Sequence, residues 1–353
     1  MTNVLLAVLV AFSPLYGMDI SIETVTGTGF FGHADGEMAR FNMPHGVLVD
    51  EMGNVYVLDT FNNMVRMVSQ GETTTLTGGI IGLDQFGFPL GHYVDGNVDD
   101  AMFYRPMGGA IDGYGRIFLA DSLNHSIRLI DGDDVFTLAG GGIPGHMDGV
   151  GTDALFSHPS DVAIGPCGSL FVADSLNHVI RKIDMYGEVF TIAGIPGEYG
   201  YNDGSAHESL FNSPMGIAVC MDGVIFVADT GNHLIRKIED GYVATLAGQL
   251  VFPGDVEWEY PGGDFDDLPI GGFMDGYEPL FSLPTGIAVF GEDIIVADTA
   301  NHAIRRILPT GYVMTVASGY FHFPRGVFVW EGMIFVADTG NNMVRIIVEV
   351  QHD

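Results

Sequence analysis

The chain has 353 residues, and its 50 glycines and 16 prolines are spread along its whole length. This composition favours many short strands joined by turns over long helices. The 45 acidic residues outnumber the 13 basic ones and give a formal net charge of −32, which repels nucleic-acid phosphates and anionic lipid headgroups. We therefore expect no nucleic-acid partner, although solubility alone would also explain so much acid.

Residues 1–19 are a possible signal peptide or N-terminal extension. Residues 1–12 form an apolar run with no lysine or arginine before it. The run is too short to span a bilayer and resembles the hydrophobic segment of a secretory signal. This interpretation predicts a secreted or extracytoplasmic protein without membrane insertion. The alternative is a strand packed on the rest of the chain.

A motif of the form Asp-x-x-Asn-(His/Asn)-x-(Ile/Val)-Arg recurs six times. Its copies begin at Asp59, Asp121, Asp174, Asp229, Asp298 and Asp338. A Phe-x-x-Pro element precedes each copy, and its proline lies 15 residues before the aspartate in the first four copies and 14 in the last two. Such regular self-similarity is typical of a repeat architecture in which each copy is one structural unit.

The copy that follows Pro214 shows how one unit is built. Residues 216–220, 224–228, 234–238 and 242–248 are four short runs separated by turn residues. The second run is apolar throughout, which indicates burial on both faces. Four antiparallel strands in every repeat predict the blade of a propeller.

These repeats resemble the NHL family. Residues 229–238 contain the Asn-His-Leu triplet that names the family, and the copies from Asp174 and Asp298 are similar. The resemblance implies an all-β fold, in which residues 20–350 form one six-bladed β-propeller of four-stranded antiparallel blades. The repeats lie near residues 41–78, 103–140, 156–194, 211–248, 281–318 and 321–350, and residues 20–28 are added to the last one.

The ring is expected to close through the N-terminal strand. The sixth copy ends after its third strand, whereas residues 22–27 resemble an orphan fourth strand similar to residues 244–248. Pairing this strand with the C-terminal blade would close the ring and remove exposed sheet edges.

The repeated polar residues are interpreted as structural. Asp and Asn side chains bond to nearby backbone amides in tight turns, and the repeated arginine is expected to pair with carboxylates or carbonyls. A further Asp-Gly pair precedes five blades, at Asp35, Asp95, Asp148, Asp203 and Asp275, and is missing before the sixth. We interpret these pairs as turns. Calcium binding is the alternative, because carboxylates and loop carbonyls are its preferred ligands.

Two departures from the repeat are candidate ligand sites. The acidic segment 249–272 contains Trp258, and long loops on a rigid scaffold often bind or cover ligands. A solvated insertion is the alternative for this segment.

The second departure is the variable residue after each Phe-x-x-Pro element: His45, Met107, Ser160, Met215, Thr285 and Arg325. The resemblance implies that these residues ring the channel mouth, where Arg105 would join His45 and Arg325. Such a basic cluster could hold an anionic ligand. Pairing with the abundant carboxylates is the alternative.

The sequence contains no nucleophile elbow, phosphate loop, zinc-binding helix or cysteine cluster. We therefore predict a non-enzymatic, monomeric module that binds a protein or another extracellular ligand through the loops of one propeller face. His45, Arg105, Arg325 and Trp258 are its candidate ligand-binding residues. The alternative, suggested by certain six-bladed relatives, is a lyase or hydrolase that uses calcium or another divalent metal in the central channel. Fold analogy alone is a weak argument for such activity.

Overall fold

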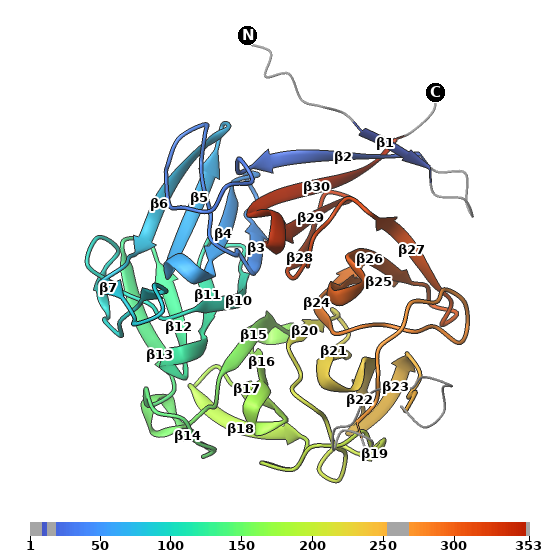
Figure 1. Cartoon of the computed structure of the whole chain (residues 1–353). Helices are drawn as coiled ribbons and strands as arrows, with labels where there is room; N and C mark the ends of the chain where they lie inside the picture. The colour runs from blue at the N-terminus through green and yellow to red at the C-terminus, as the bar shows by residue number, and fades with distance from the viewer. Residues whose placement is uncertain (1–8, 13–18, 253–267, 351–353) are drawn as a thin grey trace.

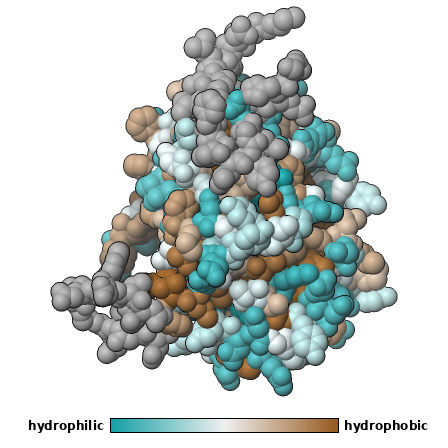
Figure 2. Space-filling model, turned by 90° about the vertical axis from the view of Figure 1, so that its right-hand side faces the viewer, coloured by the Kyte–Doolittle hydropathy of each residue, from teal (hydrophilic) through white to brown (hydrophobic). Residues whose placement is uncertain are grey.

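The computed structural model describes residues 9–12, 19–252 and 268–350. Six antiparallel sheets stand as blades around a central channel (Figure 1). The described residues contain short 3-10 turns and no α-helix, and no helix among them could cross a membrane. The flank of the ring shown in Figure 2 carries hydrophilic and hydrophobic residues interspersed.

Each blade is built from strands that follow one another outward from the channel. Blade one contains β3 (Gly46–Val49), β4 (Val55–Asp59), β5 (Met64–Ser69) and β6 (Glu72–Gly78). Blade two contains β10 (Pro106–Ile111), β11 (Ile117–Asp121), β12 (Ser126–Asp131) and β13 (Asp134–Ala139). Blade three contains β15 (Pro159–Ile164), β16 (Leu170–Asp174), β17 (Val179–Ile183) and β18 (Glu188–Ala193).

The second half of the ring repeats this plan. Blade four contains β20 (Gly216–Val219), β21 (Ile225–Asp229), β22 (Leu234–Glu239) and β23 (Tyr242–Ala247). Blade five contains β24 (Pro284–Phe290), β25 (Asp293–Asp298), β26 (Ala303–Ile307) and β27 (Val313–Ser318). Blade six contains β28 (Val327–Trp330), β29 (Met333–Asp338) and β30 (Met343–Val350), followed in the sheet by β2 (Asp19–Thr26) and β1 (Leu9–Phe12).

The Asp-Gly pairs do more than turn the chain. In blades two, three and four they lead into a fifth, two-residue strand: β9 (Gly96–Asn97), β14 (Gly149–Val150) and β19 (Gly204–Ser205). In blades one and five, Gly36 and Gly276 make isolated bridges to the outermost strand instead. A small hairpin, β7 (Gly82–Leu83) with β8 (Pro89–Leu90), lies outside the blades.

The core lies between neighbouring blades. Strands β11, β16 and β21 are buried along their entire length, as their continuous apolar runs predict. The phenylalanines of the Phe-x-x-Pro elements are at most 5% exposed and fill the spaces between sheets: Phe41, Phe103, Phe156, Phe211, Phe281 and Phe321.

The repeated arginines bind buried carboxylates, as the sequence predicts. Arg128 lies 2.6 Å from Asp121, the aspartate of its own motif, and both side chains are fully buried. The same pair forms in the other blades, with the last one partly exposed. Burial raises the pKa of Asp121 to about 6, although Arg128, Asn124 and the Tyr104 amide all favour the carboxylate. The arginine is therefore needed to hold this aspartate charged inside the protein.

The turn residues after each motif aspartate join one blade to the next. In five blades a Thr or Ser hydroxyl donates to the carbonyl of the next blade's proline at 2.5–2.7 Å: Thr60, Ser175, Thr230, Thr299 and Thr339. Thr339 reaches Pro44 and so connects blade six back to blade one.

The His or Asn at the fifth position of each motif makes a second connection. Its Nδ1 or Oδ1 accepts an amide of the next blade at 2.9–3.2 Å, in all six blades. The residues that donate these amides have φ angles of 48–59°, a left-handed conformation that the bond helps to hold. Asn63 and Asn342 replace His in two copies because the amide oxygen offers the same acceptor.

The N-terminal strand completes blade six. β2 pairs antiparallel with β30 from Asp19 opposite Val350 to Thr26 opposite Val344, the arrangement that the strand count predicts (Figure 1). Ile20 and Ile22 of β2 are nearly fully buried in the core of this blade. The two ends of the propeller are thus held together by a ladder and by apolar contact.

Loss of the closing strand should destabilise the entire ring. Ile22→Ala removes buried apolar surface at the closure and should lower the free energy of unfolding by about 3 kcal/mol. Thr24→Ala, on the same strand but exposed, should cost less than about 1 kcal/mol. Urea unfolding measures both, and a deletion of residues 20–28 should lower the melting temperature further. Equal stability of the deletion and the parent chain would contradict closure by β2.

The connection made by the motif histidine can be tested at His178. His178→Ala removes the acceptor of the Ser213 amide and should cost about 1–3 kcal/mol, whereas His178→Asn should lose less than half of that. Since His178 has a φ of 59°, His178→Gly suits the backbone but still lacks the acceptor, and should also be destabilised. If urea unfolding showed that His178→Asn loses as much free energy of unfolding as His178→Ala, the role of this bond would be refuted.

Candidate functional site

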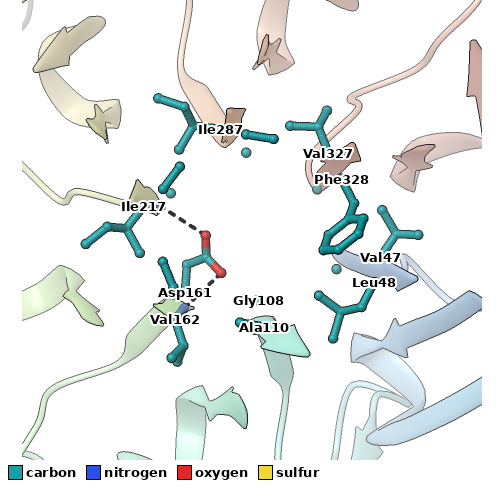
Figure 3. A pocket seen from close by; sticks show the side chains of 18 of the residues that line it. Val47, Leu48, Gly108, Ala110, Asp161, Val162, Ile217, Ile287, Val327 and Phe328 are labelled. Carbon is teal, nitrogen blue, oxygen red and sulfur yellow. Dashed lines mark hydrogen bonds between the residues drawn. The ribbon is translucent and has the colours of Figure 1, made fainter. Parts of the chain in front are cut away.

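The six innermost strands enclose a cavity of about 270 Å³ along the channel. Figure 3 looks into it, with apolar side chains such as Leu48, Ile287 and Phe328 around the lumen. All six strands begin at the same end of the channel, because each blade repeats the same path. The residues that start them line this end together: His45, Met107, Ser160, Met215, Thr285 and Arg325.

The imidazole of His45 is buried in this ring without a side-chain hydrogen bond in the described part of the chain. Neither ring nitrogen has an acceptor or donor within reach in the described part of the chain. Burial lowers its pKa well below the usual value, and the charges of Arg325 and Arg105 lower it further. The imidazole is therefore neutral at neutral pH and offers one donor and one acceptor to a ligand.

Arg105 and Arg325 lie near His45 and have no carboxylate partner among the residues described. The Arg105 guanidinium lies 3.6 Å from the centre of the Phe61 ring, which also contacts His45 at 6.2 Å between ring centres. Nη1 of Arg105 and Nε of Arg325 are buried without a hydrogen bond. Burial lowers the pKa of both guanidinium groups, although the charge of Asp84, which lies beyond ion-pair distance, opposes this shift at Arg105. The cost of burying them is thus not offset by an ion pair.

The structure brings together three of the four predicted site residues. The alternative for His45, Arg105 and Arg325, pairing with nearby carboxylates, is not seen in the described residues. Eight of the eleven arginines do form ion pairs there, and Arg40 is the third exception. Trp258 lies outside the described residues, as does most of segment 249–272.

The residue that follows each member of this ring along the chain is glycine in five blades and aspartate in one, and these six residues also surround the channel. A Cβ on Gly216 or Gly286 would lie 1.9–2.0 Å from a carbonyl oxygen of the next blade, so no side chain fits there. A Cβ on Gly46 or Gly326 would lie 2.3–2.5 Å from such an oxygen, and one on Gly108 would lie 2.2 Å from Oδ1 of Asp161. The sixth position, in blade three, is Asp161.

Asp161 bridges three blades with its side chain. Its two carboxylate oxygens accept the amides of Ile217 at 3.1 Å and Val162 at 2.9 Å, as Figure 3 shows, and Gly109 of blade two bonds to it as well. Burial raises its pKa to about 7 against these three amides. Near neutral pH it can therefore accept or donate a proton at the channel wall. The sequence signal for it is the single departure from Pro-x-Gly among six copies.

The metal-dependent alternatives stay predictions. Within residues 9–12, 19–252 and 268–350, no group of three or more His, Cys, Asp and Glu side chains could hold a metal ion. The aspartates of the five Asp-Gly pairs, the candidate calcium ligands, each bind an arginine instead.

The raised pKa of Asp161 predicts a pH-dependent stability. Between about pH 4 and pH 7 the folded chain holds a proton at this site that the unfolded chain has lost, so stability falls as pH rises. Asp161→Asn cannot titrate, and its stability relative to the parent should rise by about 2 kcal/mol from pH 5 to pH 7. Urea unfolding at several pH values measures this change, with the exposed Asp99→Asn as a control that should show none. A constant difference for Asp161→Asn would contradict the assignment.

Comparison with known proteins places the chain among NHL-repeat proteins. The NHL repeat family model matches residues 211–238 and 281–307. Protein SUPPRESSOR OF QUENCHING 1, chloroplastic, of Arabidopsis thaliana is 30% identical over 66% of this chain and 29% of its own length. Human NHL repeat-containing protein 2 is 32% identical over 39% of this chain and 21% of its own length. The chain thus spans less than a third of each of these two relatives.

A solved structure supports the fold. Virginiamycin B lyase from Staphylococcus aureus superposes with a TM-score of 0.53 and 14% identity, over 88% of this chain and 96% of that one. At this identity the match concerns the fold alone. The repeated motif, the six blades and the family match agree: the chain carries NHL repeats and folds as a six-bladed β-propeller.

Proposed function

We propose that this propeller is a binding module that recognises a ligand through one face and holds an anionic group of that ligand at the channel mouth. NHL propellers often serve as protein-interaction modules, which supports the general class. The observation that carries the proposal is the pair of partly buried guanidinium groups, Arg105 and Arg325, which form no ion pair with any described carboxylate.

The abundance of acidic residues in the chain makes arginines without an ion pair unexpected. With 45 acidic residues available, two partly buried arginines that form no ion pair with a described carboxylate are a cost that folding does not require. A ligand carboxylate or phosphate would supply the missing charge and form charge-assisted hydrogen bonds. Neutral His45 lies beside them and can donate to the same group without adding repulsion. The strongly negative remainder of the surface disfavours polyanions such as nucleic acid.

The lumen below the mouth indicates the shape of such a ligand. Its walls are mostly apolar, and the cavity of about 270 Å³ admits a small group. The ligand therefore has an anionic group at the mouth and a short apolar part in the channel. A protein side chain or a small organic acid of the extracellular space fits this description.

Binding of small anions tests the proposal. Inorganic phosphate and linear carboxylates from acetate to octanoate are titrated into the full chain by calorimetry, with ligand-dependent melting temperature as a second measurement. Arg325→Ala should weaken binding by about tenfold or more, because it removes one side of a buried charge contact. His45→Ala should weaken it to a lesser degree.

Arg40→Ala is the matched control, because it removes the same charge from an exposed position outside the channel lining. It should leave the affinity within about twofold of the parent value. Equal affinities for the parent, Arg325→Ala and Arg40→Ala would refute an anion site at the mouth.

A further inference from the structure

Five of the six blades enclose their repeated arginine between two carboxylates. In blade two, the terminal nitrogens of Arg128 lie 2.6 Å from Asp121 and 2.6 Å from Asp95 of the Asp-Gly pair. The guanidinium is fully buried, whereas Asp95 is 47% exposed and covers it from solvent. The other four sites have the same two carboxylates.

The segment that brings the second carboxylate has constant features. It consists of an aromatic residue, any residue and then Asp-Gly, at residues 33–36, 93–96, 146–149, 201–204 and 273–276. In blade two the carbonyl of Val94 accepts from Arg128 at 2.8 Å, and Thr137 donates its amide and its hydroxyl to Asp95 at 3.0 Å. A threonine makes the same two bonds in each of the other four sites.

Blade six has the arginine and the threonine of this site but lacks the Asp-Gly segment that binds them in the other blades. Thr24 of β2 lies opposite Arg345 of β30, at the same register as Thr137 opposite Arg128. Arg345 donates through Nε to Asp338 at 2.6 Å and meets no second carboxylate in the described part of the chain. Its side chain is 22% exposed, against 0% for the other five arginines. Its terminal nitrogens are thus open to a ligand.

Strand β1 lies beside this site but does not supply the missing charge. Leu9 of β1 pairs with Ile22, the register position at which Gly96 pairs with Val135 in blade two. The first 18 residues contain no aspartate or glutamate. β1 therefore covers part of the sheet edge and leaves the guanidinium without its second carboxylate.

We infer that Arg345 and Thr24 form a docking site for an acidic peptide segment of a partner protein, with the pattern aromatic-x-Asp-Gly. The partner's aspartate binds Arg345 and Thr24 as Asp95 binds Arg128 and Thr137. Its glycine joins the edge of β2 in place of Leu9. The five filled sites of the same chain argue for this occupant, because they show what the arginine and threonine pair accepts.

The net charge of −32 opposes the approach of an acidic peptide only at long range. At physiological ionic strength charges are screened over about 8 Å, so the local contacts decide whether the complex forms. A guanidinium that meets a carboxylate with two nitrogens makes a strong, directional contact. This site lies on the outer part of blade six and is independent of the channel mouth.

The chain's own sequence provides the probe. The peptide acetyl-Tyr-Val-Asp-Gly-Asn-amide, which copies residues 93–97, is titrated into the full chain at 0.15 M salt and followed by fluorescence anisotropy of a labelled form. We expect saturable one-to-one binding. The same peptide with Asn in place of Asp should bind at least about tenfold more weakly, and acetate alone should not compete at equal concentration.

Protein variants locate the site. Arg345→Lys keeps a positive charge beside Asp338, but its single ammonium group cannot bind Asp338 and the peptide carboxylate as a guanidinium can. It should weaken peptide binding by about tenfold. Its melting temperature shows whether the variant is folded. Arg325→Ala, at the channel mouth, should bind the peptide as the parent does, so this test and the anion titration can fail separately. Equal binding of the Asp and Asn peptides, or unchanged affinity of Arg345→Lys, would overturn the inference.

Discussion

The structure depends on one buried interaction, an arginine held by the aspartate of its own motif. Removing the charge of Arg128 would leave Asp121 buried and unpaired, which is far more costly than losing a surface ion pair. The pair ties the end of the second strand to the third, and Asn124 and the Tyr104 amide bind the same carboxylate. Five blades are thus organised around an ion pair whose two side chains are fully buried, and blade six differs because its arginine is partly exposed.

The blades are joined by polar bonds as well as by apolar packing. A hydroxyl and a His or Asn acceptor from one blade bind backbone groups of the next, while a phenylalanine fills the space between the sheets. These bonds hold the innermost strands so close that glycine is required at five positions around the channel. Asp161 occupies the sixth position and replaces close contact by hydrogen bonds to neighbouring strands. The bonds between neighbouring blades therefore determine which residues can line the channel.

The distribution of basic residues separates scaffold from candidate function. Most arginines are bound to aspartates that the repeat itself supplies, so they are structural. Among the described residues, Arg105 and Arg325 are partly buried beside neutral His45 and form no ion pair, and Arg345 binds one carboxylate where its equivalents bind two. A repeat protein shows its binding sites where a copy departs from the others. The two proposed sites are such departures, one at the channel mouth and one on the outer part of blade six.

The sequence by itself determined the number of blades, the four repeated strands of each blade and the structural role of the motif arginines. These follow from local periodicity and from spacing that repeats six times, so no knowledge of distant contacts is needed. It also placed His45 and Arg325 in one ring, because equivalent positions of a repeat share a location. Only the tertiary structure decided that the Asp-Gly pairs bind arginines about 30 residues further along the chain, that Asp161 bridges three blades, and that Arg105 and Arg325 form no ion pair with a described carboxylate. Contacts between residues far apart in the chain depend on side-chain directions and distances in space, which the order of residues along the chain does not specify.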